Sequence, residues 1–134
     1  MKPPNTVPSF ARSAPGFKRS PCPITNTLDV LGDRWTLLVV RDLFLGKRLF
    51  GEFSASPEGI PTNILADRLK RLEREGVLCR IPYQERPVRY AYTLTDKGRD
   101  LSPVLEAMMG WANRHIPETA RLPRDMVEKL RRGR

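Results

Sequence analysis

The hydrophobic period of this sequence changes within one short stretch, and that change limits the possible folds more than any other feature. Leu65, Leu69 and Leu72 recur at helical spacing and share one face of a predicted helix. Gly76 is placed to end that helix. Beyond it the apolar residues alternate with a period of two, which is typical of a β-strand; they are Val77, Cys79, Ile81 and Tyr83.

A second alternating run completes a hairpin. Its apolar face would carry Val88, Tyr90, Tyr92 and Leu94, and residues 84–87 would connect the two strands. A helix followed by a hairpin predicts a winged helix. We therefore expect a mostly helical α+β fold with a two- or three-stranded antiparallel wing and a C-terminal dimerisation helix.

The net charge of +9 indicates a polyanionic partner. Residues 1–21 carry four Lys/Arg and no acids, and residues 118–134 carry six Lys/Arg against three acids. Between the two ends, residues 61–99 hold nine Lys/Arg against five Asp/Glu. The positive charge of the central region therefore lies on the predicted helix and hairpin.

Composition divides the chain into three parts. Residues 1–21 contain five prolines and predict a disordered, Pro-rich basic arm, which is either inert or in contact with phosphates or a partner subunit. Residues 22–117 would form the DNA-binding and dimerisation domain, and residues 118–134 a basic C-terminal tail that is partly helical. Neither a membrane span nor a signal peptide is indicated, so we expect a cytoplasmic protein.

The remaining helices follow from apolar spacing and capping residues. One runs from Pro23 to Gly32, and a second, capped by Asp33, ends at Gly46. A short third helix lies near residues 49–53. For the basic helix, either Pro61 is the first helical residue or Thr62 is the N-cap. A further helix begins after Thr95, with a bend or break near Pro103.

The residues that usually carry catalysis are sparse. The one histidine, His115, is expected to pack in a partly buried position rather than act as a base. Two distant cysteines and one histidine cannot supply the four ligands of a structural zinc site. The sequence has no phosphate-binding glycine loop. We therefore expect neither an enzyme nor a metal site or cofactor.

Several motifs in fixed order give the chain a resemblance to a known family. They are CPITNTLDVLGDRWTLLVVRDLFLGKRLFGEF, GIPTNILADRLKRLEREGV, RPVRYAYTLTDKG and LSPVLEAMMGWA. Between about Cys22 and Ala112 the chain resembles the HxlR-type winged helix-turn-helix transcription regulators. The resemblance implies a homodimer formed by the first and last helices, a recognition helix in the major groove and a wing over the backbone. It also implies that the cysteine at the Cys22 position senses electrophiles or oxidants in some relatives.

These considerations predict three sets of site residues. The DNA-binding set is Thr62, Asn63, Ala66, Asp67, Lys70, Arg71, Arg74, Arg86 and Arg89. The dimer-interface set is Ile24, Leu28, Leu101, Leu105, Met108 and Trp111, although the last four also fit an ordinary core helix. The third set is Cys22 alone, either a redox sensor or a packing residue; Cys79 should be inert on the apolar face of its strand.

The predicted function is regulation of transcription by a homodimer that binds a pseudo-palindromic operator in double-stranded DNA. A small-molecule or oxidant effector remains unidentified. The alternative is a small basic RNA-binding protein. Against that alternative, single-strand readers stack bases on exposed aromatic rings, whereas Tyr90 and Tyr92 alternate onto the predicted apolar face.

Overall fold

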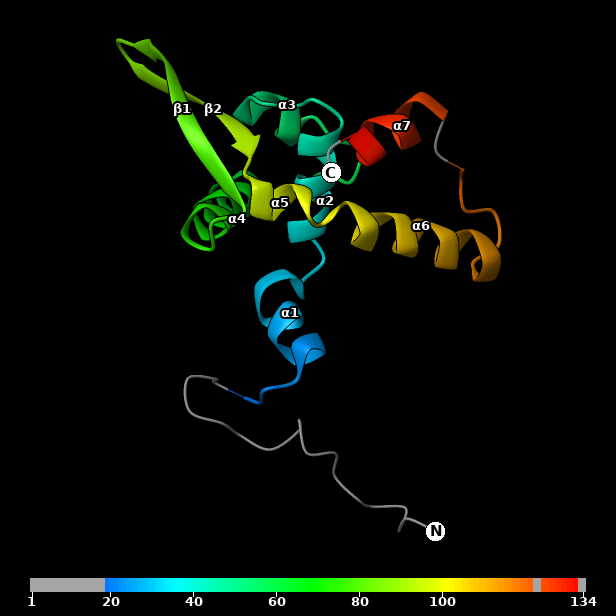
Figure 1. Cartoon of the computed structure of the whole chain (residues 1–134). Coiled ribbons are helices and arrows are strands. Elements are labelled where there is room, and N and C mark those ends of the chain that lie inside the picture. The colour runs from blue at the N-terminus through cyan, green and yellow to red at the C-terminus, as the bar shows by residue number, and fades with distance from the viewer. Residues whose placement is uncertain (1–18, 122–123, 133–134) are drawn as a thin grey trace, which may run out of the picture. The chain divides into compact units, whose positions relative to one another are not determined.

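The computed structural model describes residues 19–121 and 124–132, which fall into two units, residues 1–33 and 34–134 (Figure 1). Most of the predicted N-terminal arm lies outside the described residues. The elements in chain order are α1 (Pro23–Leu31), α2 (Thr36–Phe44), α3 (Phe50–Ser54), α4 (Thr62–Arg74), β1 (Leu78–Glu85), β2 (Val88–Leu94), α5 (Asp96–Arg99), α6 (Ser102–His115) and α7 (Arg124–Arg132).

The first unit is built around α1. Pro23 begins the helix, where its fixed φ and missing N–H cost nothing. The N–H of Gly32 closes the helix by donating to the carbonyl of Leu28 at 2.7 Å. The predicted helix from Pro23 to Gly32 is therefore confirmed. Arg19 forms an ion pair with Asp29 at 2.6 Å and ties the preceding residues to the helix.

The core of the second unit lies where α2, α3 and α4 meet. Val40, Leu65 and Leu72 are fully buried, and Phe53 is 1% exposed. Each buried aliphatic side chain contributes about 1.5–3 kcal/mol of hydrophobic stabilisation. The leucine stripe that predicted α4 is therefore the side of the helix that faces the core.

The start of α2 differs from the prediction. Trp35, rather than Asp33, is the N-cap residue, and its carbonyl accepts hydrogen bonds from the N–H groups of Leu38 and Val39. Asp33 lies two residues before this cap. The predicted short third helix is confirmed as α3.

The ends of α4 are set by its flanking residues. Pro61 is the N-cap and has an extended ψ of 142°, so both alternatives drawn from the sequence were one residue out of place. At the other end, Gly76 adopts a left-handed φ of 74°. The N–H of Gly76 donates to the carbonyl of Glu73, and the N–H of Val77 donates to the carbonyl of Leu72. These two bonds form a Schellman motif. The predicted glycine stop is confirmed.

The hairpin is a two-stranded antiparallel sheet in which Leu78 pairs with Leu94 and Glu85 with Val88. β2 has the predicted bounds, whereas β1 continues to Glu85, two residues beyond its predicted end, so only Arg86 and Pro87 remain as the turn. The predicted apolar face of β1 was wrong: Leu78, which the alternation places on the other face, is buried, whereas Ile81 and Tyr83 are about half exposed. On β2, Leu94 is buried as predicted. This exposure agrees with Figure 1, in which the tip of the hairpin extends beyond the helices.

The C-terminal half continues from the hairpin through α5. Thr95 caps α5, since its hydroxyl accepts a hydrogen bond from the N–H of Gly98 at 3.1 Å. Gly98 lies so close to Val77, the residue before β1, that an added Cβ would come 2.1 Å from the carbonyl oxygen of Val77. The expected break near Pro103 is confirmed, because α5 ends at Arg99 and Pro103 lies in the first turn of α6.

Helix α7 packs on α6. Leu130 is 1% exposed, and its carbonyl accepts a hydrogen bond from the hydroxyl of Ser102 at 2.5 Å. Arg131 lies 4.0 Å from Glu106 of α6. The predicted burial of His115 was wrong, because this residue is exposed at the end of α6, where its ring contacts Trp111.

Candidate nucleic-acid interface

The side of α4 opposite the core is polar and exposed. Of the predicted DNA-binding residues on this helix, Thr62, Asn63, Asp67, Lys70 and Arg74 are exposed, and Ala66 and Arg71 are half-buried. The helical period places Asn63, Asp67, Lys70 and Arg74 opposite the buried leucines, with Thr62, Ala66 and Arg71 toward the edges of that polar side. The predicted set on α4 therefore forms one continuous surface along the 13 residues of the helix, about three and a half turns.

Two arginines next to this surface were missed by the sequence analysis. Arg68 forms an ion pair with Asp67, so the carboxylate that would repel a phosphate is partly neutralised. Arg80 of β1 lies 3.3 Å from Glu73 of α4 and stacks over the ring of Tyr90 at 4.3 Å. Arg80 could have been suspected from the alternation of β1, which places it opposite Cys79 and Ile81.

The two predicted wing arginines lie together at the hairpin tip. Arg86 is in the turn and Arg89 is the second residue of β2, and both side chains are exposed. The hairpin carries them away from α4 (Figure 1). The structure thus places the predicted DNA-binding residues in two groups, one on the helix and one at the tip.

A buried carboxylate holds the turn that leads into α4. Asp42 is 3% exposed, and its carboxylate accepts hydrogen bonds from Ser56 at 2.5 Å and from Arg41 at 3.0 Å. The two terminal nitrogens of Arg41 also donate to the two carboxylate oxygens of Glu58, at 2.8 and 2.9 Å. These bonds raise the pKa of Arg41 and lower that of Glu58. The end of α2 and the α3–α4 turn are therefore joined by paired charges.

The wing is attached to the same region of the chain. The N–H of Tyr92 donates to the carbonyl of Arg48 at 2.8 Å, and Leu49 forms a β-bridge with Ala91. The ring of Tyr92 also meets Phe53 of α3 edge to face. Glu52 caps α3 by accepting from the N–H groups of Arg48 and Leu49, which lowers its pKa. The wing is therefore attached to α3 and to the residues just before it, in the same unit as the polar surface of α4.

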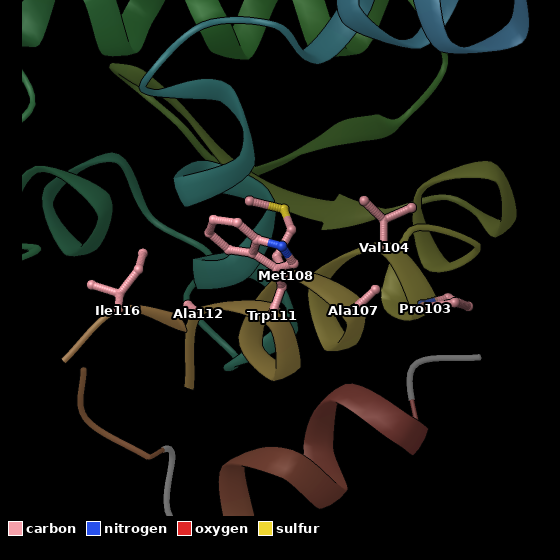
Figure 2. Close-up of a pocket in the computed structure, with 7 residues that line it drawn as sticks. All are labelled: Pro103, Val104, Ala107, Met108, Trp111, Ala112 and Ile116. Atoms are coloured by element: carbon pink, nitrogen blue, oxygen red, sulfur yellow. The ribbon is translucent and has the colours of Figure 1, made fainter. Parts of the chain in front are cut away.

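An apolar surface lies on α6, away from α4. Figure 2 shows its groove, whose lining comes from α6 and the residue that follows it: Pro103, Val104, Ala107, Met108, Trp111, Ala112 and Ile116. Met108 and Trp111 are 49% and 56% exposed. Of the other predicted dimer residues on this helix, Leu101 is half-buried and Leu105 is only 7% exposed. Leu105 therefore belongs largely to the core of the second unit.

In the first unit, the predicted dimer residues of α1 are also open to solvent. Ile24 is 71% exposed and Leu28 is 54% exposed.

Cys22 is the N-cap residue of α1 and is 8% exposed. The backbone N–H and the hydroxyl of Thr25 lower the pKa of its thiol, against the opposing effect of desolvation. Cys79 is half-buried on β1 rather than enclosed in the core. Both thiols are free.

The part of the chain that the structure describes shows no group of three or more His, Cys, Asp and Glu side chains that could hold a metal ion. Within residues 19–121 and 124–132, none of the helices has the length and apolar content that crossing a bilayer requires.

Comparisons with known proteins agree with this geometry. A family model described as HxlR-like helix-turn-helix matches residues 30–120. An HTH-type transcriptional regulator of Mycobacterium tuberculosis is 38% identical over 94 residues, which is 70% of this chain and 59% of that protein. The chain therefore matches less than two thirds of that relative's length.

Two solved structures share the fold. The reduced form of the transcriptional regulator YodB from Bacillus subtilis superposes with a TM-score of 0.62 at 34% identity, over 74% of this chain and 98% of that one. The redox regulator HypR in its oxidised form gives a TM-score of 0.63 at 33% identity, over 70% and 97% of the two chains.

Proposed function

This chain belongs to the HxlR-like helix-turn-helix family of DNA-binding transcription regulators, and we propose that it binds a pseudo-palindromic operator in duplex DNA as a homodimer. The observation that carries the proposal is α4, whose buried leucines orient Asn63, Lys70 and Arg74 outward as one surface. A helix of this kind fits the major groove, which is wide enough to admit it.

The two groups of DNA-binding residues have different tasks in this proposal. Thr62, Asn63, Ala66 and Asp67 lie in the first turns of α4, the part of a recognition helix that reads base edges. Lys70, Arg71 and Arg74 lie further along the helix and contact phosphates. Arg86 and Arg89, at the tip of the wing, contact the DNA backbone or the minor groove. Phosphate contacts fix the register, and base contacts select the sequence.

Homodimerisation brings two copies of α4 to the two half-sites. The exposed apolar side chains of α6, together with Ile24 and Leu28 of α1, support this assignment because a solvated monomer would leave them uncovered. A response to oxidants through Cys22 is supported by the lowered pKa of its thiol and by the similarity to the redox regulator HypR.

Recovery of genomic DNA fragments bound to the purified protein tests the function. We expect a small set of fragments that share an inverted repeat, whose half-sites lie one helical turn apart or a multiple of it. In a competition assay, a duplex that carries this repeat should displace single-stranded RNA of equal length. If the RNA displaces the duplex instead, the protein is an RNA-binding protein and the proposal is wrong.

A further inference from the structure

A cavity of about 300 Å³ lies between α2, α6 and α7, and no role has been given to it above. Its volume is at the lower end of the range of small-molecule sites, which is about 300–1,000 Å³. The cavity shares Met108 and Ala112 with the groove of Figure 2 but is otherwise lined by different residues. Its apolar lining also includes Leu37, Leu38, Leu105, Met109, Ala120 and Leu130.

Two polar side chains in the lining, Asn113 and Arg41, have partners already. Asn113 donates to the carbonyls of Thr119 and Ala120, at 3.4 and 3.3 Å, and so holds the loop at the cavity. The guanidinium of Arg41 is paired with the carboxylates of Asp42 and Glu58. An anion entering the cavity would have to compete with both carboxylates, and a cation would meet the guanidinium. The lining therefore favours an uncharged ligand.

We propose that this cavity binds an uncharged, mostly apolar small molecule, and that its occupancy changes the affinity of the protein for DNA through Arg41. The inference rests on the proposed DNA-binding function and adds a class of effector to it.

Arg41 connects the cavity to the recognition helix. Its side chain lines the cavity and also binds Glu58, which lies three residues before Pro61, the N-cap of α4. Gly59, between them, is in the left-handed region with a φ of 70°. A ligand that shifts Arg41 must therefore shift or release Glu58, and with it the residues that lead into α4. Effector and DNA then affect each other's affinity reciprocally.

Binding is tested with N-phenyl-1-naphthylamine, an uncharged dye whose fluorescence rises in apolar surroundings. Ala120→Trp narrows the cavity from an exposed loop position and should weaken dye binding about tenfold or more. The matched control is Ala107→Trp, which fills the groove of Figure 2 and does not line the cavity. Thermal melts of both variants check that the fold is retained.

Coupling is tested by measuring operator affinity with and without saturating dye. We expect a change of about threefold or more in the full-length protein, lost in Glu58→Gln although the dye still binds. Glu75→Gln is the matched control: it removes the same charge from an exposed glutamate at the far end of α4 and should keep the dye effect.

Three results would overturn the inference: no dye binding to the wild type, binding abolished by Ala107→Trp but not by Ala120→Trp, or a dye effect on DNA that survives Glu58→Gln. A protein that binds the dye but no duplex DNA would instead overturn the proposed function, because dye binding is measured without DNA.

Discussion

Single side chains on α4 have consequences that differ with their place on the helix. Asn63 is exposed in the first turn and presents an amide, which can pair with adenine through two hydrogen bonds. Arg74 is exposed in the last turn, where a phosphate contact is expected. The two residues should therefore affect specificity and affinity separately.

Asn63→Ala should weaken binding to the preferred operator by about 1–3 kcal/mol and relax base preference at one position of each half-site. Arg74→Ala should weaken binding to all duplexes to a similar extent, because a phosphate contact carries no sequence information. Fluorescence anisotropy with operator and random duplexes measures both. If Asn63→Ala weakens binding to the operator and to the random duplex equally, Asn63 does not contact a base.

Cys22 should react faster than Cys79. The lowered pKa of Cys22 increases its thiolate fraction at neutral pH. The pH at which its alkylation rate is half-maximal should therefore be lower than for an ordinary cysteine thiol. The thiol is only 8% exposed, so α1 must open for the reagent to enter. Mass spectrometry of iodoacetamide-treated protein from pH 6 to 10 follows both sites.

Diamide should change operator affinity in the wild type and in Cys79→Ser, but not in Cys22→Ser. Were Cys79 to react first, or Cys22→Ser to respond like the wild type, Cys22 would be a packing residue at the start of α1.

At the scale of elements, the wing is a projecting hairpin that carries its charge at the tip. The side chains of Arg86 and Arg89 are both exposed, so their removal should leave the fold intact. Their contribution is expected in the electrostatic part of binding, which depends on salt because each phosphate contact releases counterions.

With about eight phosphate contacts per dimer, the slope of log affinity against log salt should be about −7. Replacing Arg86 and Arg89 together by alanine should flatten this slope. The matched control replaces Arg114 and Arg124, two exposed cations on other helices, and should leave the slope unchanged. An unaltered slope in the wing variant would mean that the tip does not touch DNA.

The elements themselves were largely predictable from sequence, because their signals are local. The leucine spacing of α4, the glycine after it and the alternation of the strands each lie within a few residues. What failed depended on distant contacts: the exposure of Ile81 and Tyr83 follows from how far the hairpin projects, and that of His115 from where α6 ends. Arg80 was missed because its partners, Glu73 and Tyr90, lie on other elements.

At the scale of the whole molecule, the subunit leaves apolar area uncovered on α6. The proposed homodimer buries Met108 and Trp111, and light scattering should give a mass about twice the 15.3 kDa of one chain. Met108→Arg should shift this mass toward the monomer at micromolar concentration, since a charge would be buried without a partner. Ile81→Arg, at an equally exposed apolar residue on the wing, should not. A monomeric wild type, unaffected by Met108→Arg, would contradict the proposed interface.

The close contact of Gly98 with Val77 makes the base of the wing and the start of the α5–α6 segment one rigid joint, since no side chain fits between them. In the proposed dimer, this joint then helps to fix the spacing of the two α4 recognition helices, because it does not act as a hinge. One base pair inserted between the half-sites turns one of them by about 34–36° around the DNA axis. A dimer with such a joint cannot turn one recognition helix to match the rotated half-site. It should therefore select its operator by the length of the central spacer as strictly as by the bases on either side of that spacer.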